Sequence, residues 1–363
     1  MQRHVARPLG FHGGGDPVAP TGEPLRWGVV ATGKIAHTVT AQLARLEDAR
    51  LRAVSSRDAI KAAAFATMYG FEASYSDVPG LSGHEALADD PHVDVVYVAT
   101  PHGQHHRVAA SLLAAGKHVL IEKAFTVTGA EAADLVAIAR SRGVFLMEAV
   151  WTRFLPAYQA ALDVVESGEL GEVRYVQADM GFMAERDPRT RLWAPVDGGG
   201  ALLDLAVYPL TWVIGALGLP HAVQAIGRVN AEGVDELSAL TCGYPGGELA
   251  HVIASFVSSS TRRARIVGTE GYLETDAPLT RPDGFTVVAR GEERHESVPS
   301  GPEPYTFQLR EVTRCVQEGR LESPTMPLAD TVATMRLFDE VRRQLGVRLP
   351  NDEAGLGAPK PAT

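Results

Sequence analysis

Lys123 is the first of three residues in this 363-residue chain whose side chains could handle a proton. It directly follows the run Lys117-His-Val-Leu-Ile-Glu122, whose composition predicts a buried strand. An ammonium group at a strand end can hold a substrate hydroxyl group, or lower the pKa of a neighbouring acid through its charge. A lysine at a strand end can also simply be solvated, so the elements around Lys123 must decide between the two interpretations.

The other two residues, Asp204 and Tyr208, lie four positions apart in the most apolar stretch of the chain, residues 201–219. This spacing places both side chains on one face of a helix. A carboxylate among leucine, alanine and valine is costly unless it is paired, which makes Asp204 a candidate for a site. Helix capping by Asp204 and simple packing by Tyr208 are the alternatives. The stretch is nearly long enough to span a bilayer, but Asp204 and Pro209 favour a buried helix.

Histidine and aromatic side chains could line a substrate pocket beside these residues. His102, His105 and His106 follow the third predicted strand, and we expect His105 to point into the cleft. Trp151 and Phe182 could form walls for a sugar or aryl ring, although both are also ordinary core candidates. No group of histidine, cysteine and acidic residues has the spacing of a zinc site, so we expect no metal.

The elements that must position these residues begin near the start of the chain, where residues 25–43 predict a strand, a turn and a helix. The apolar run from Leu25 to Val30 predicts a buried strand, and a helical pattern follows it. At the positions of a Gly-x-Gly-x-x-Gly pattern the chain has Ala31, Gly33 and Ala36. Such a turn brings backbone N–H groups and a helix N-terminus to a pyrophosphate. A fingerprint that has lost its first glycine is weak evidence by itself.

Four more predicted strands, at residues 51–57, 93–99, 117–122 and 144–147, alternate with helical patterns. This alternation predicts a doubly wound parallel sheet, the Rossmann arrangement, with right-handed crossovers. Ligands bind beyond the carboxyl ends of such strands. We therefore expect a nicotinamide dinucleotide in contact with residues at four strand ends: Thr32, Gly33, Lys34 and Ile35; Ser56 and Arg57; Thr100, Pro101 and His102; and Glu122 and Lys123.

The end of the second strand, Val54-Ser55-Ser56-Arg57, bears on the choice of cofactor. An acidic residue at this point binds the ribose hydroxyls and favours NAD, whereas an arginine accommodates the 2′-phosphate of NADP. We expect NADP rather than NAD. If the strand ended one residue later, Asp58 would face the ribose and reverse that preference.

The pattern changes after Trp151, where short strand-like runs with glycine turns occupy residues 221–296 and predict a largely antiparallel sheet. We divide the chain into a flexible leader (1–24), a dinucleotide-binding domain (25–148), an α+β domain for substrate binding and oligomerisation (149–350), and a flexible tail (351–363). The predicted fold class is thus α/β with a second, α+β domain. One apolar face of the second sheet would be exposed in a monomer, so we expect a homodimer or a dimer-based tetramer.

Composition narrows the possible partners and the compartment. The formal net charge of −10 argues against nucleic acid or an anionic membrane as the main partner. The two cysteines, Cys242 and Cys315, lie far apart, which suits a reducing compartment and predicts a cytoplasmic protein. A small-molecule substrate is the expected partner.

Four motifs together resemble the Gfo/Idh/MocA oxidoreductase family, and the resemblance covers roughly residues 25–350. They are Ala31-Thr-Gly-Lys-Ile-Ala36, Thr100-Pro-His-Gly-Gln-His105, Ala115-Gly-Lys-His-Val-Leu-Ile-Glu-Lys123 and Gly198-Gly-Gly-Ala-Leu-Leu-Asp204. The run Met147 to Pro156, and Tyr208 where many relatives carry histidine, are most similar to the subgroup of dihydrodiol and NADP-dependent D-xylose dehydrogenases.

The resemblance implies an open-faced antiparallel sheet in the second domain, commonly used to form a dimer. It also implies Lys123 and Tyr208 at the reaction centre, Asp204 beside them, and His105, Trp151 and Phe182 around the substrate. Two positions depart from the family pattern: Ala124 replaces the usual proline and Ala206 a glycine. Neither change removes a reactive group, but both bear on the shape of the pocket.

The prediction is an oxidoreductase that moves a hydride between a nicotinamide cofactor and a hydroxyl carbon of a sugar or cyclic diol. Tyr208 would carry the hydroxyl proton, and the charge of Lys123 would lower the pKa of that phenol. One alternative is a carbonyl reductase that uses the same site. The other is a nucleotide-binding sensor or regulator that kept the fold and lost turnover.

Overall fold

The computed structural model describes residues 16–352, and its first half is a six-stranded parallel sheet between helices. The strand order is β3-β2-β1-β4-β5-β6, and every neighbouring pair is parallel. The strands are β1 (Leu25–Val30), β2 (Ala49–Ser56), β3 (Ala73–Ser76), β4 (Val95–Val98), β5 (His118–Glu122) and β6 (Leu146–Ala149). The helices are α1 (Lys34–Leu43), α2 (Ala59–Tyr69), α3 (Gly83–Ala88), α4 (His102–Ala114) and α5 (Gly129–Arg142). The predicted doubly wound sheet is thereby confirmed.

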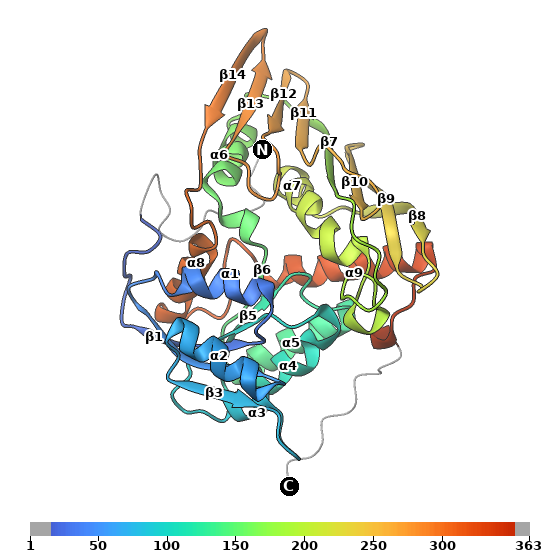
Figure 1. The fold of residues 1–363 in the computed structure, drawn as a ribbon. Coiled ribbons are helices and arrows are strands. Elements are labelled where there is room, and N and C mark those ends of the chain that lie inside the picture. Colours follow the sequence, from blue (N-terminus) through green and yellow to red (C-terminus); the bar gives the residue numbers. More distant parts are fainter. Residues whose placement is uncertain (1–15, 353–363) are drawn as a thin grey trace.

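The second half is an eight-stranded sheet with helices against one face; in Figure 1 its strand β7 is green and the other strands are yellow to orange. Its order is β14-β13-β12-β11-β7-β10-β9-β8, and only β7 and β10 are parallel neighbours. The strands are β7 (Val173–Gly181), β8 (Ala222–Val229), β9 (Asp235–Gly243), β10 (Leu249–Ser255), β11 (Ala264–Gly268), β12 (Gly271–Thr275), β13 (Gly284–Ala289) and β14 (Glu292–Ser297). The expected largely antiparallel sheet is confirmed.

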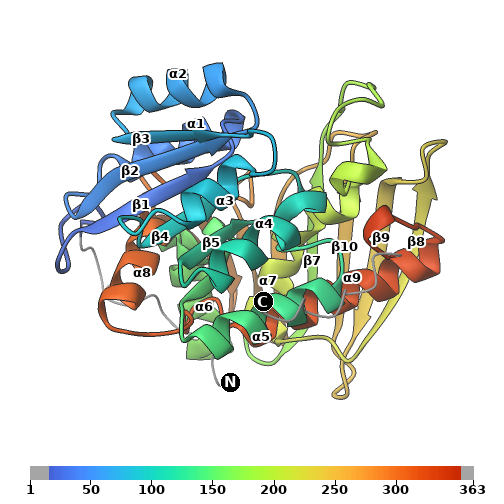
Figure 2. The same ribbon diagram turned by 90° about the horizontal axis from the view of Figure 1, so that it is seen from below.

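Helices connect the two halves and cover the inner face of the second sheet. A 3₁₀ turn (Trp151–Phe154) and α6 (Pro156–Ser167) follow β6, and α8 (Thr306–Gln317) and α9 (Leu328–Leu345) come after the last strand. In Figure 2, α9 runs beside α5 of the first half and reaches β8 of the second. Short 3₁₀ turns also occupy Pro195–Asp197 and Pro350–Asp352.

The most apolar stretch forms a π-helical turn (Leu202–Ala206) that continues into α7 (Val207–Leu217). Residues 195–217 are long and apolar enough to cross a membrane by composition alone, and 89% of the most apolar window is buried inside the protein. The helix packs against β7, β10 and β11, so its apolar side chains form core contacts.

Two parts of the first half differ from the sequence prediction. The strand β3 and the helix α3 were not predicted, because a four-residue strand and a six-residue helix are too short to show a clear period. The predicted strand at 144–147 lies at 146–149, since β6 pairs through Leu146 to Ala149 with β5.

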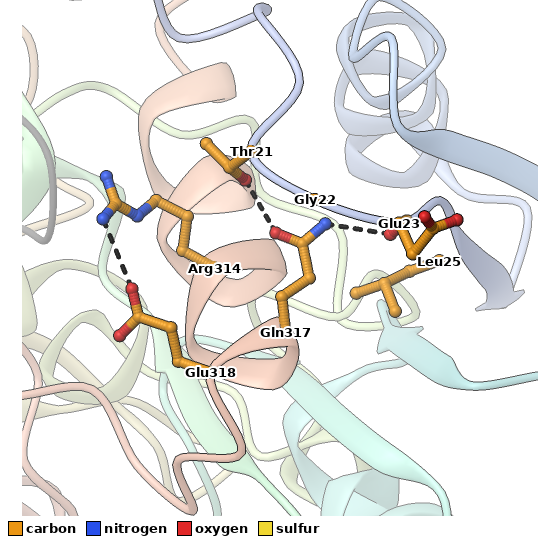
Figure 3. A pocket seen from close by; sticks show the side chains of 7 residues that line it. All are labelled: Thr21, Gly22, Glu23, Leu25, Arg314, Gln317 and Glu318. Atoms are coloured by element: carbon orange, nitrogen blue, oxygen red, sulfur yellow. Dashed lines mark hydrogen bonds and ion pairs between the residues drawn. The ribbon is translucent and has the colours of Figure 1, made fainter.

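The predicted flexible leader is wrong for residues 16–24, whereas residues 1–15 lie outside the described residues. Arg310 of α8 and Asp48 form a buried ion pair at 2.8 Å, and the Arg310 guanidinium also donates to the carbonyl oxygens of Pro17 and Val18. In Figure 3, Thr21 donates to Gln317, whose amide donates in turn to the carbonyl of Glu23. This segment is therefore fixed against α8 by polar contacts.

A surface cavity of about 450 Å³ lies at this contact, and none of the predicted site residues lines it.

At the C-terminal end of the described residues, Asn351 and Asp352 of the predicted tail bind Glu131 and Arg342, and residues 353–363 lie outside the described residues.

Candidate active site

The three residues predicted to handle a proton lie together in the structure. The Lys123 ammonium, directly after β5, donates to Oδ1 of Asp204 at 3.0 Å and to the Asp204 carbonyl oxygen at 2.5 Å. The same nitrogen lies 5.0 Å from the ring centre of Tyr208. A strand end of the first half and a helix of the second half therefore supply one compact group.

The start of the apolar helix places Asp204 at this position. Asp204 lies in the π-helical turn, and its neighbour Leu202 donates its N–H to the buried Asp235 carboxylate at 2.7 Å. Gly200 has φ +116° and lies so close to Asp235 that a β-carbon there would approach Oδ1 to 2.3 Å. Only glycine can adopt this positive φ and also approach Asp235 so closely, which explains why position 200 is a glycine.

Asp204 is an ionised carboxylate held by two cations. Burial alone would raise its pKa, but the charges of Lys123 and Arg191 outweigh burial and hold the pKa below its ordinary value. Arg191 donates from Nη1 to the same oxygen, Oδ1, at 3.0 Å. The sequence prediction did not include Arg191, which lies on the loop between β7 and the π-helical turn.

Tyr208 does not have the lowered pKa that we expected from Lys123. Burial raises the pKa of the phenol above its ordinary value, and the Glu122 carboxylate adds to the effect. The Lys123 ammonium lies over the ring face and donates two of its three N–H groups to Asp204. The Tyr208 hydroxyl oxygen instead accepts a hydrogen bond from Trp151 Nε1 at 3.2 Å.

Of the two aromatic residues predicted to line the substrate pocket, Trp151 contacts Tyr208, whereas Phe182 packs against Phe256. Trp151 contacts Tyr208 and stacks on Tyr305, with ring centres 4.4 Å apart, so it belongs to the same group. Tyr305, just before α8, was not predicted. Phe182 packs edge-to-face on Phe256, which itself contacts Trp193 of the loop that carries Arg191.

The histidines are buried between backbone carbonyl groups, which corrects the expectation that His105 points into the cleft. The His105 ring is fully buried, with Nε2 at 2.7 Å from the Thr100 carbonyl and Nδ1 at 3.0 Å from that of Ala124. Both nitrogens thus face carbonyl oxygens and neither faces a cleft. Burial lowers the pKa of His105 to about 4, so the ring is neutral and donates to one of these carbonyls through its single N–H. His102 similarly joins the carbonyls of Lys123 and Gly198, each at 3.0 Å. His106 lies apart, beside Asp134.

Glu148 of β6 supports the turn that follows Lys123. It is buried, accepts the Phe125 N–H at 3.1 Å and the Thr331 hydroxyl at 3.0 Å, and burial raises its pKa to about 7. On the neighbouring strand, Glu122 accepts the Tyr97 hydroxyl at 2.5 Å. Both carboxylates act within the protein's own hydrogen-bond network.

The predicted cofactor residues form an edge with free donors. Gly33 caps α1 without a side-chain hydrogen bond, and a β-carbon on it would meet nothing within 4 Å. The buried Thr100 hydroxyl has no hydrogen-bond partner among residues 16–352. Open space at a helix N-terminus and an unpaired buried hydroxyl fit a dinucleotide at these strand ends. Lys34 and Ile35 are the first two residues of α1, and Pro101 caps α4.

Two further residues of the cofactor edge, Ala31 and Asp58, are fixed by the local backbone. Ala31, at the first position of the glycine pattern, has φ +82°, which is the left-handed region that glycine favours. Asp58 caps α2, accepting N–H groups from Ile60 at 2.8 Å and Lys61 at 3.1 Å. Among the described residues, no three side chains of histidine, cysteine or acidic type form a metal site.

Comparisons with known proteins agree with this arrangement. Residues 25–150 match the oxidoreductase family with an NAD-binding Rossmann fold, and residues 158–274 match the GFO/IDH/MocA C-terminal domain. The trans-1,2-dihydrobenzene-1,2-diol dehydrogenase of Sus scrofa is 36% identical over 343 residues, covering 91% of this chain and 99% of that protein. The human enzyme of the same name is 34% identical over 342 residues, with the same coverage.

A solved aldose-aldose oxidoreductase from Caulobacter crescentus superimposes with a TM-score of 0.80 at 26% identity, covering 89% of this chain and 97% of that one. The two domain models of one family match this chain one after the other, and the relatives align along nearly their whole length. The chain is an oxidoreductase of the GFO/IDH/MocA family with an NAD(P)-binding Rossmann domain.

Proposed function

We propose that the protein is an NADP-dependent dehydrogenase that oxidises a CH–OH group of a sugar or a cyclic diol. The observation that carries this proposal is the group formed by Lys123, Asp204 and Tyr208 at the carboxyl edge of the parallel sheet. The relatives named above act, by their names, on a diol and on aldoses, which supports this class of substrate.

In this proposal the phenolate form of Tyr208 accepts the proton of the substrate hydroxyl, while a hydride leaves the carbon that bears this hydroxyl. The bound cofactor supplies the hydride acceptor. Lys123 is held by Asp204 beside the phenol, where its remaining N–H can donate to the substrate oxygen. Trp151 donates to the tyrosine oxygen and orients it, and its stacking on Tyr305 fixes the indole ring. His105 is a positioning residue, since it holds the turn after Lys123 through the Ala124 carbonyl.

NADP is the proposed cofactor because of the residues at the end of β2 and directly after it. Arg57 is exposed and has no hydrogen-bond partner among residues 16–352, so its guanidinium is free to bind a phosphate. Ser56 lies beside it, within reach of Thr32. Asp58, the residue that could have bound the ribose of NAD, is engaged as the cap of α2.

A second copy of this chain is the proposed partner of the outer face of the second sheet. Register places exposed apolar residues side by side on that face: Tyr175 pairs with Leu249, and Ile226 and Ile253 both pair with Ala239. The opposite face carries buried residues such as Val176 and Val252. A homodimer, or a tetramer built from dimers, would cover this surface. Light scattering at micromolar concentration tests it, and a monomer would contradict it.

We further propose a cytoplasmic location, which two buried free thiols, Cys242 and Cys315, support. The net charge of −10 likewise supports a small-molecule partner over nucleic acid or an anionic membrane surface.

The decisive experiment is a screen of aldoses and cyclic trans-diols with NADP⁺ and with NAD⁺, following absorbance of the reduced cofactor. The proposal expects turnover of at least one compound, faster with NADP⁺. Turnover only of a ketone with the reduced cofactor would favour a carbonyl reductase, the direction that the name of a 3-ketoreductase relative at 26% identity suggests. Nucleotide binding without any turnover would favour a regulator.

A further inference from the structure

Arg191 lies on a loop, residues 182–201, whose fold is fixed close to the arginine itself. Trp193 is buried and donates its indole N–H to the Glu185 carbonyl at 2.8 Å. The N–H of Gly200 donates to the Leu192 carbonyl at 2.9 Å, which ties this part of the loop to the start of the apolar helix. The backbone therefore presents Arg191 to the site from a defined position.

The guanidinium of Arg191 shares one carboxylate oxygen with the lysine of the reaction centre. Its Nη1 and the Lys123 ammonium each lie 3.0 Å from Oδ1 of Asp204. The Asp204 side chain is only 9% exposed, whereas that of Arg191 is 53% exposed. Asp204 is the only hydrogen-bond partner of Arg191 among residues 16–352, so the other N–H groups of the guanidinium remain available.

The charges around Tyr208 explain why a second cation matters. Burial, Glu122 and Asp204 all raise the pKa of the phenol, while the charge of Arg191 lowers it. The titratable groups that face this cluster come from several elements: Tyr97 of β4, Glu122 and Lys123 at the end of β5, His102 of α4, Arg191 of the loop, Asp204 of the π-helical turn and Tyr305 before α8.

We propose that Arg191 is a positioning residue of this site: it shares Asp204 with Lys123 and offsets the negative charge beside Tyr208. Lys123 donates two of its three N–H groups to Asp204, so the third remains for the substrate oxygen, and Arg191 holds the carboxylate that orients this ammonium. Because Arg191 is positive, it favours the phenolate form of Tyr208, which must be present before the phenol oxygen can accept the substrate proton. This inference rests on the proposed function and adds a residue to it.

The test compares Arg191→Met with Arg191→Lys and with Arg189→Met. Arg189 is a matched control, since it lies two residues away on the same loop, is 90% exposed and pairs only locally with Asp187. For each variant, kcat and KM for the best hydroxy substrate are measured across pH, together with the Kd of NADP⁺.

Loss of a positive charge raises the pKa of Tyr208, so the rising limb of the kcat profile should move to higher pH. For Arg191→Met we expect a shift of about half a pH unit or more and about a tenfold loss of kcat at neutral pH. Activity should recover in part at higher pH, and the Kd of NADP⁺ should stay the same. Arg191→Lys should restore most of the pH profile, and Arg189→Met should match the wild type.

An unchanged pH profile in Arg191→Met would overturn this inference, as would the same loss in Arg189→Met, which would indicate a general effect of the loop. Neither result would touch the proposed function. A wild-type protein without turnover on any hydroxy compound would overturn both.

Discussion

The reaction centre and the cofactor edge lie on the same sheet but differ in how their polar groups are used. At the reaction centre, Asp204 is buried, Lys123 and Tyr208 are partly buried, and the polar group of each side chain binds another residue of the protein. At the cofactor edge, Gly33 leaves the start of α1 uncapped and Arg57 is exposed and unpaired among residues 16–352. The comparison indicates that the reaction centre is organised in advance, whereas the edge keeps donors free for phosphates.

The largest expected effect is the loss of the proton carrier in Tyr208→Phe. Removing the phenol leaves the proton of the substrate hydroxyl without an acceptor, so kcat should fall about 10²-fold or more. Lys123→Met should cost a similar factor. The Kd of NADP⁺, measured by fluorescence titration, should change little in either variant. Near-normal turnover in Tyr208→Phe would leave Lys123 as the acid–base group.

At the cofactor edge, Arg57→Ala should weaken NADP⁺ binding without affecting NAD⁺. Hydrogen bonds to charged groups contribute about 1.5–3 kcal/mol, which corresponds to roughly a ten- to a hundredfold change in Kd. Titration calorimetry with both cofactors measures the ratio. An equal loss with NADP⁺ and NAD⁺ would show that the guanidinium does not bind the 2′-phosphate.

Asp58→Ala separates helix capping from cofactor recognition at the neighbouring position. Loss of the cap of α2 should lower the free energy of unfolding by about 1 kcal/mol, measured by urea denaturation. The ratio of the two cofactor affinities should not change, because the carboxylate binds N–H groups of its own helix. A selective loss of NAD⁺ binding would instead assign the carboxylate to the ribose.

The smallest effect is expected at Ala31, whose φ of +82° is unfavourable for any residue with a β-carbon. Ala31→Gly should relieve about 1 kcal/mol of backbone strain, partly offset by the greater freedom of glycine in the unfolded chain. Thermal unfolding should shift upward by about a degree or two. Ala36→Gly, inside α1, is the control and should destabilise the protein by about 1 kcal/mol.

The sequence was sufficient to locate residues whose positions follow from regular structure. Lys123 was found because topology brings the ends of parallel strands to one edge, and Asp204 and Tyr208 because helical spacing places them on one face. The sequence could not show Arg191 or Tyr305, since an irregular loop and a segment before a helix have no period that predicts direction.

The sequence also could not predict which side chains turn inward or which segments are fixed by contacts with distant residues. His105 follows a strand end as a cofactor or substrate residue would, but its ring turns inward to carbonyl groups. Residues 16–24 have the composition of a linker, and only their contacts with Arg310, nearly 300 positions further along, fix them in place.

The most direct measurement follows the hydride itself. A hydroxy substrate that turns over is labelled with deuterium on the carbinol carbon and incubated with NADP⁺ and the wild-type protein or Tyr208→Phe. We expect the wild type to carry the label into the reduced nicotinamide ring, and Tyr208→Phe to do so at a rate about 10²-fold lower. Label released to water, or equal rates of transfer in the two proteins, would contradict hydride transfer coupled to a proton on Tyr208.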